Sequence, residues 1–532
     1  MRVCVYSIWK RVGSWRFEAR SILTILFSYR TRRHSYVPSS IFLLLASIFP
    51  LPSSSQEKVR IEIINANTLA GSAGVKKLLG NVILRQDNAT MTCDSAYLYD
   101  GDSRFEGYSN VFINQGDSMT LAGDKVIYDG SSKQAQVTGK TVKLKQGNMA
   151  LTTDRIDYNM RTKEANYTTG AKMLSAENSL TSRFGTYYSN TKEMLFKKNV
   201  VLSNPDYIMR TEEMRYNTQT EISYFTGPTR IVTTSGDTVF CRKGWYDTRK
   251  DLSNFSSGAY ISSGSQRMDA DSMIYDRKLG WGRAYQHILF TDTAEHIELN
   301  GHRGQYWQKT RTAVMTDSAL AIQISDGDSI FIHADTLYYA DDSTKANGKL
   351  MLAYRGARVY KSDLQAKADS LAYSWADSTI KLYNDPVLWH KENQLTADTI
   401  FIYRSGKGID SLQLRTHSFV CSQEKGPHFN QIKGENISGL FDSSDLRKVV
   451  VTGGGESIYY IKEDSLHYTG INHINCDHMA ISLAGKEVKG IRFYMDNKGE
   501  LLPVNSIPPA QNRLKGYTWR DALRPKDREG VW

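Results

Sequence analysis

A ten-residue segment recurs about every thirty residues along most of the 532-residue chain. It reads "LAGDKVIYDG" at residues 121–130 and returns as "LTTDRIDYNM", "MRTEEMRYNT", "MDADSMIYDR" and "IHADTLYYAD". Its acidic position falls at residues 94, 124, 154, 183, 212, 242, 271, 302, 335, 369 and 398, in steps of 29 to 34. The chain therefore has eleven units, or thirteen with the weaker copies at residues 435–440 and in "HINCDHMAI". Such a period is typical of solenoids and arrays.

Inside each unit the apolar residues alternate with a period of two, which predicts strands. Val126 and Tyr128 share one face, and a second alternating segment, such as that of Val111 and Ile113, precedes each one. Clusters such as "NQGDS" supply the turns. We expect two or three short strands per unit and no helix to cover a sheet. Apolar strand faces must then pack on each other, which predicts an all-β, long repetitive antiparallel sandwich or bent two-sheet trough.

Most units carry a tyrosine four places after the acidic position, as Asp124 and Tyr128 do. Stacked tyrosines form a ladder along an array, while each hydroxyl can stay near water or a carbonyl. We therefore expect both columns to be turn and ladder residues rather than reactive groups. In two units the tyrosine comes one place later, at Tyr99 and Tyr403, which a β-bulge would explain.

The two ends of the chain differ in composition from the repeats. The first residues have the order of an export signal: a basic stretch, the apolar run "IFLLLASIF" and the small polar residues "PSSSQ". We predict an export signal, cleaved or kept as an anchor, over residues 1–55, and the repeat array over residues 56–502. Residues 503–532 are polar and rich in Pro and Arg, and we expect a mobile or partner-docking tail.

The formal net charge of +11 does not indicate nucleic-acid binding. Residues 1–36 hold eight Lys or Arg against Glu18 alone, so the rest of the chain carries 59 basic against 55 acidic residues and no basic stripe. Without Cys4 of the signal, four cysteines remain: Cys93, Cys241, Cys421 and Cys476. Because Cys93 and Cys241 hold the same position in distant units, they cannot meet in a stacked array. Buried free thiols are expected, although an exported protein permits disulfides.

The segments "GNVIL", "MTCDSAYLYD", "SNVFINQGDSMTLAGDKVIYDG" and "KQAQVTGKTVKLKQ" resemble the OstA-like (organic solvent tolerance) family. The chain is similar in this respect to the periplasmic lipopolysaccharide-transport bridge proteins, most strongly over residues 59–230 and more loosely to about residue 480. The resemblance implies a V-shaped antiparallel β-jelly-roll whose apolar inside holds the acyl chains of lipopolysaccharide, with copies joined end to end. This chain departs from a single bridge subunit in having many more repeats.

The resemblance implies a non-enzymatic bridge in the periplasm of a Gram-negative bacterium, exported and associated with the inner or outer membrane. We expect lipopolysaccharide or another acylated lipid as ligand, and transport components of both membranes as partners through end-strand pairing. The inward columns would line the lipid groove, and an ordinary closed core is the alternative for the same side chains. The predicted lining residues are Val126, Tyr128, Ile156, Tyr158, Met214, Tyr216, Met273, Tyr275, Leu337, Tyr339, Leu371 and Tyr373.

Other classes of protein have weaker support. The alternative function is a structural β-solenoid scaffold that binds envelope proteins or glycans. Catalysis is not expected, because carboxylates recur in every unit whereas an active site is local, and no nucleophile motif or phosphate-binding loop is present. No cofactor is implied, and His467, His473, Cys476 and His478 are expected to be strand residues rather than metal ligands.

Overall fold

The structure is a computed structural model of the chain, and it describes residues 61–532 apart from 73, 100–102, 117–118, 176, 326, 343–347, 406–407, 425, 443–444, 463–466, 485–486 and 505. The predicted export signal lies outside the described residues. The described residues belong to one compact unit, Lys58–Trp532. Among them there is no α-helix, and no helix is long and apolar enough to span a membrane.

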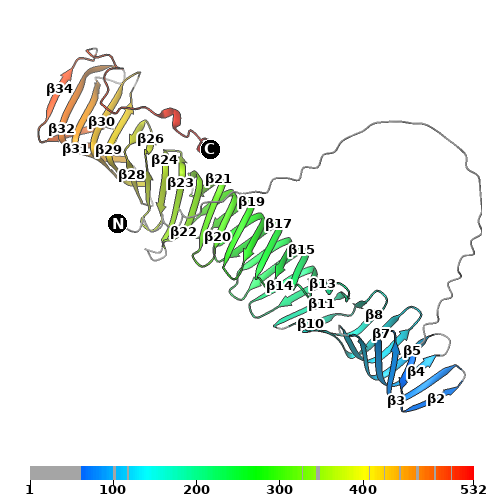
Figure 1. Cartoon of the computed structure of the whole chain (residues 1–532). Helices are drawn as coiled ribbons and strands as arrows, with labels where there is room; N and C mark the ends of the chain where they lie inside the picture. The colour runs from blue at the N-terminus through cyan, green and yellow to red at the C-terminus, as the bar shows by residue number, and fades with distance from the viewer. Residues whose placement is uncertain are drawn as a thin grey trace, which may run out of the picture. The chain divides into compact units, whose positions relative to one another are not determined.

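The described residues form one antiparallel sheet in which strands follow each other in chain order (Figure 1). The long strands have 10 to 18 residues. They are β3 (Val75–Gln86), β4 (Ala89–Tyr99), β5 (Arg104–Gln115), β6 (Thr120–Asp129), β7 (Gln134–Gln146), β8 (Met149–Asn159), β13 (Glu193–Ser203), β14 (Tyr207–Asn217), β15 (Ile222–Thr233), β16 (Thr238–Asp247), β17 (Leu252–Ser263), β18 (Gln266–Asp276), β19 (Trp281–Asp292), β20 (Ile297–Trp307), β21 (Thr312–Gln323), β22 (Ile330–Asp342), β23 (Gly348–Lys361), β24 (Leu364–Ser374), β29 (Gly408–Gln423), β30 (Phe429–Asp442), β31 (Asp445–Lys462) and β32 (Tyr468–Ala484).

Shorter strands occur at both ends of the sheet and where a long strand is divided in two. They are β1 (Glu62–Asn65), β2 (Thr68–Ser72), β9 (Glu164–Tyr167), β10 (Ala171–Ser175), β11 (Asn178–Ser182), β12 (Phe184–Tyr188), β25 (Thr379–Tyr383), β26 (Val387–His390), β27 (Asn393–Thr396), β28 (Thr399–Ser405), β33 (Glu487–Tyr494) and β34 (Lys498–Leu502). The predicted all-β repetitive fold is confirmed. The strands are longer than expected, because most units are two long strands of one continuous sheet that supplies both walls of the trough.

Each long strand bends near its middle, so two walls of the sheet face each other across an apolar interior. Wall A contains the halves next to turns such as residues 87–88 and 147–148, and wall B the halves next to turns such as residues 130–133 and 160–163. One hydrophobic cluster, from Leu78 to Ile481, runs through this interior. Phe290 of wall A meets Tyr339 of wall B with ring centroids 5.8 Å apart.

A two-residue bulge in the left-handed backbone region produces the bend in most units. In β5 the register with β6 shifts between Tyr108 and Val111, and the residues between them, Ser109 and Asn110, have φ of 62° and 50°. Such bulges bend a strand and increase its twist. Paired positive φ values recur at residues 80–81, 198–199, 257–258, 286–287, 317–318, 355–356, 416–417 and 453–454.

The repeated acidic residues brace these bulges. Asn110 Nδ2 donates to Asp94 Oδ2 at 2.8 Å, and the backbone N–H of Lys140 donates to Asp124 Oδ2 at 2.8 Å. Asp271 pairs with Nδ1 of a bulge histidine in the same way. The repeated acidic residues therefore stabilise the bends of the strands, which agrees with their expected role as turn residues.

The two displaced tyrosines need no bulge before them. Leu98 and Ile402 hold the position four residues after the acidic residue, and both are buried. Strand β4 pairs with β5 in unbroken register from Ser95 to Tyr99. Tyr99 and Tyr403 are only half-buried, one place beyond the inward position. In these units an aliphatic residue replaces the inward tyrosine.

Residues 503–532 are docked on the array itself. From β34 this segment returns along β31, β29, β27 and β24 to β22 and β23, and it includes two short 3₁₀-helices, Asp521–Leu523 and Glu529–Val531 (Figure 1). Beneath it the outer face of wall A is apolar, with Trp389, Phe419 and Phe429 buried outside the main cluster. Of the two expectations for this segment, a mobile tail does not agree with this packing, because an apolar outer face needs a cover, and partner docking stays a prediction.

Candidate functional site

The predicted groove residues all lie on wall B and point into the apolar interior. They come from the second halves of β6, β8, β14, β18, β22 and β24. Ten of the twelve have at most 5% of their surface exposed, while Tyr216 and Tyr275 are half-buried against the same cluster. The structure therefore brings the predicted residues together in one interior, and holds most of them in closed core.

Hydrogen bonds from wall B to wall A close the open side of the V. The Tyr128 hydroxyl donates to Gln86 Oε1 and the Tyr158 hydroxyl donates to Gln115 Oε1, each pair more than forty residues apart in sequence. Because Gln86 and Gln115 end strands of wall A, whereas the tyrosines lie near the free margin of wall B, these bonds join the two walls. We call this set of cross-wall bonds the polar seam.

The polar seam continues in later units with other residue types. The Tyr339 hydroxyl donates to Asp292 Oδ2 at 3.1 Å, and Trp375 Nε1 donates to Gln323 Oε1 at 2.9 Å. Asp292 is buried, and burial by itself raises the pKa of its carboxyl. Hydrogen bonds from Gln266, Ser265 and Tyr339 outweigh burial and leave the pKa below its ordinary value. The carboxylate is thus charged and acts as an acceptor for the seam.

The inward tyrosines are neutral donors across the physiological pH range. Burial raises the pKa of Tyr158 and of Tyr187 to about 12. It also raises the pKa of Tyr128 and Tyr339, with nearby carboxylates adding to the effect. Because an ionised phenol is strongly disfavoured in this interior, the column suits an apolar lining better than acid–base chemistry.

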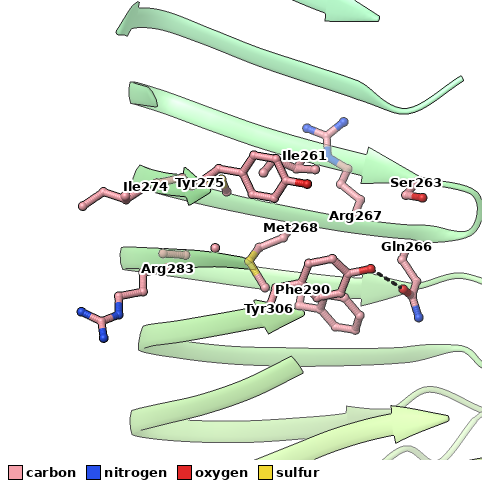
Figure 2. Close-up of a pocket in the computed structure, with 13 residues that line it drawn as sticks. Ile261, Ser263, Gln266, Arg267, Met268, Ile274, Tyr275, Arg283, Phe290 and Tyr306 are labelled. Carbon is pink, nitrogen blue, oxygen red and sulfur yellow. Dashed lines mark hydrogen bonds between the residues drawn. The ribbon is translucent and has the colours of Figure 1, made fainter. Parts of the chain in front are cut away.

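The seam is weaker over β14–β20. The last inward residue of wall A is Thr233 in β15 and Ser263 in β17, in place of the longer glutamine or aspartate of other units. Tyr306 reaches Gln266 Oε1 only at 3.4 Å (Figure 2). The Tyr275 hydroxyl donates to Gln308 of its own wall. Shorter side chains at the margin of wall A thus leave Tyr275 and Tyr306 half-buried, whereas Tyr246 of β16 is buried and donates to Asp251.

A small cavity lies behind this weak part of the seam. It has a volume of about 30 Å³ and is lined mainly by apolar side chains from both walls, including Met268, Met273, Tyr275 and Phe290 (Figure 2). Figure 2 shows Met268, Phe290 and Tyr306 gathered between the strands, whereas Ile274 and Arg283 point away. A volume near that of one or two water molecules cannot hold an acyl chain. An acyl chain therefore requires the two walls to separate.

The wall A partners of the seam were not predicted from the sequence, although a signal exists. Gln86 and Gln115 end alternate strands just before the turn, in "RQD" and "NQG", and Gln146 has the same place in "KQG", although among the described residues its Oε1 has no hydrogen-bond partner. Each is a glutamine at a fixed place in its unit, on the same side as apolar residues such as Leu84. A polar residue that repeats on an apolar face indicates a partner of its own.

The cysteines and histidines offer no separate site. Cys93, Cys241, Cys421 and Cys476 are buried and unpaired, as expected. Burial raises the pKa of Cys93 to about 11 and of Cys241 to about 12, which suppresses thiolate chemistry. The described residues contain no group of three or more potential metal ligands, and Cys476 Sγ lies 3.6 Å from the Gly455 carbonyl oxygen.

Comparison with known proteins gives a family for the first part of the array. Residues 57–212 match the OstA-like protein family. The predicted resemblance is confirmed. The OstA-like region spans β1–β13 and the start of β14, and thus holds the first units of the seam. No curated protein matches the chain.

Among solved structures, the chain is similar to LptH from Pseudomonas aeruginosa, described as the LptA-homologous periplasmic component of the conserved lipopolysaccharide transport device. The two are 16% identical, and the match covers 26% of this chain and 81% of LptH with a TM-score of 0.15. The OstA-like region therefore remains the part of the chain whose relationship is established by sequence.

Proposed function

We propose that the chain is a non-enzymatic periplasmic bridge that shelters the acyl chains of lipopolysaccharide on their way to the outer membrane. The observation that carries the proposal is the apolar cluster that runs from Leu78 to Ile481 between two walls whose free margins are held together by a polar seam. The OstA-like match over residues 57–212 supports the same function. The periplasmic location follows from the predicted export signal together with this family.

The free energies involved favour a path between the walls over a path through water for an acyl chain. Burying one methylene is worth about 0.8 kcal/mol, so a chain of a dozen carbons gains on the order of 10 kcal/mol. Opening one seam hydrogen bond costs about 0.5–1.5 kcal/mol net. The apolar contacts between the walls are replaced by contacts with the acyl chain. Lipid can therefore separate the walls unit by unit, and the repetition gives successive sites of similar depth.

The weak seam over β14–β20 is the proposed point of entry. Tyr216 and Tyr275 are already half-buried, and the cavity beside Tyr275 is lined mainly by apolar side chains from both walls. The two edges of the sheet are the proposed docking surfaces for transport components of the inner and outer membranes. Leu69 in β2 is 57% exposed and Leu501 in β34 is 70% exposed. Open edges with exposed apolar residues favour added strands.

Photo-crosslinking tests the proposal. A photoreactive phenylalanine at Tyr216, Tyr275 or Tyr128 should capture labelled lipopolysaccharide, most strongly at the two half-buried positions. Lys250 is the control, because its side chain is 75% exposed in a turn. Lipid captured equally at Lys250, or at none of the tyrosines, would contradict a lipid-bearing interior.

A second candidate function is a structural scaffold that binds envelope proteins or glycans. The closed interior favours it, since ten of the predicted lining residues are already packed. The same crosslinking experiment separates the two functions. A scaffold would capture proteins from outward-facing positions and no lipid from inward ones.

A further inference from the structure

The docked segment, defined as residues 512–532, lies on a row of glutamines on the outer face of wall A. Gln365, Gln394 and Gln431 each stand four places before an acidic corner residue and are at most 3% exposed. In the first units the same position is Thr90 or Thr120, and both are half-exposed. The last part of the array thus has a row of buried glutamines on its outer face that the repeat of strands does not itself require.

Two of these glutamines hold the main chain of the docked segment. Gln431 Nε2 donates to the Asn512 carbonyl oxygen at 3.1 Å, and the Leu514 N–H donates to Gln431 Oε1 at 2.9 Å. Gln394 repeats the arrangement, with 2.7 Å from its Nε2 to the Thr518 oxygen and 2.7 Å from the Arg520 nitrogen to its Oε1. Each glutamine side chain binds a main-chain carbonyl and a main-chain N–H that are two residues apart, which is a spacing that an extended peptide presents.

Side-chain contacts add sequence preference to the main-chain contacts. The rings of Tyr517 and Trp519 meet Phe429 with centroids 5.5 and 5.0 Å apart. Arg513 lies over the same phenylalanine, at 4.9 Å from its centroid. Arg524 Nε donates to the third glutamine of the row at 2.8 Å. The groove therefore selects two aromatic residues two positions apart, with basic residues before and after them.

The docked segment is attached like a bound peptide rather than as a strand. Within the part of the chain that the structure describes, its main-chain hydrogen bonds to other main-chain groups stay within residues 508–532, such as Tyr517 N–H to the Leu514 oxygen. No strand of the sheet pairs with it. Side-chain recognition of this kind does not require covalent continuity with the array.

We propose that the outer face of β24–β31 is a peptide-binding groove, that residues 512–524 are its resident and releasable ligand, and that the same segment of a second copy can occupy it in trans. The second copy follows from chemistry, because it presents the same aromatic pair, arginines and main chain that the groove already binds. The proposal is independent of lipid transport.

Cys421 reports whether the groove is covered in the full chain. Its thiol is 1% exposed, and Gln394 Nε2 lies 3.7 Å from its sulfur. The double variant Gln394→Ala, Gln431→Ala should increase the rate of Cys421 modification by a small neutral reagent about tenfold or more, with Cys241 unchanged. Gln413→Ala is the matched control, because Gln413 accepts only from Arg415 on its own strand. Unchanged Cys421 protection, or equal increases at both cysteines, would overturn the proposal.

Exchange in trans is tested after cutting the link between array and segment. A specific protease site placed within residues 507–511 is cut in the purified protein, and a fluorescent peptide of residues 512–532 is added. The peptide should replace the resident segment, with a saturable rise in anisotropy and renewed protection of Cys421. The proposal would be overturned if the cut segment never exchanged with the added peptide. It would also be overturned if the segment dissociated from the wild-type protein and from the double variant at the same rate.

Discussion

The seam is tight at Tyr128, Tyr158 and Tyr339 but weak at Tyr275 and Tyr306, although the backbone repeat is the same. In the tight parts, Gln86, Gln115 and Asp292 accept hydrogen bonds from buried aromatic side chains of wall B. In the weak part, Thr233 and Ser263 take the corresponding margin position, and the facing tyrosines are half-buried. The length of one side chain per unit, the last inward residue of wall A, therefore decides whether the walls close.

Removing a whole tyrosine ring should give the largest difference between the two parts. Tyr339→Ala deletes a fully buried ring and is expected to destabilise its surroundings by about 3–5 kcal/mol. Tyr275→Ala deletes a half-buried ring and should cost about 1–2 kcal/mol. Hydrogen exchange of β22 and β18 peptides measures each loss locally, because arrays need not unfold in one step. Equal losses would remove the distinction between tight and weak seam.

Removing only the tyrosine hydroxyl should give a smaller difference in stability between the two parts of the seam, and this difference should depend on pH. Tyr339→Phe takes a donor from the Asp292 carboxylate and is expected to cost about 1.5–3 kcal/mol at pH 7, against about 0.5 kcal/mol for Tyr275→Phe.

The sign of the pH effect follows from the lowered pKa of Asp292. Its stabilising contribution is complete above the unfolded pKa of about 3.9 and is lost as the pH falls through the lower folded value. Because Tyr339→Phe reduces the shift, the variant should lose less stability below pH 4 than wild type does. Exchange rates of β22 peptides between pH 3 and 7 check this. A steeper acid loss in the variant would contradict the assigned role of the hydroxyl.

The rates at which a thiol reagent modifies Cys241 and Cys93 should give the smallest difference between the two parts of the seam, about tenfold. Cys241 in β16 lies in the weak part and Cys93 in β4 lies in a tight part, and both are buried. If modification requires the walls to open, Cys241 should react faster, because local opening there costs less free energy. Mass spectrometry of timed samples measures both. Without wall opening, the lower pKa of Cys93 would make it the faster thiol.

Much of the fold could be predicted because the pattern repeats. The positions of Val126 and Tyr128, read against ten other units, predict an inward face regardless of small local errors. The polar residues that close the V were missed, because a glutamine at the end of a strand resembles any turn residue. Only the partner forty residues later gives Gln86 its role, and that pairing depends on how far the sheet bends.

The repeat, the strands, the inward tyrosines and the OstA-like relationship of the first units could all be predicted from the residues, because alternation and period are local properties of the chain. That the two walls meet at a seam, and that residues 512–532 return to cover wall A, became visible only in the folded molecule. Both depend on groups that lie far apart in sequence, such as the Gln431 side chain and the Leu514 backbone N–H, and that meet only when the twist of many stacked strands is summed.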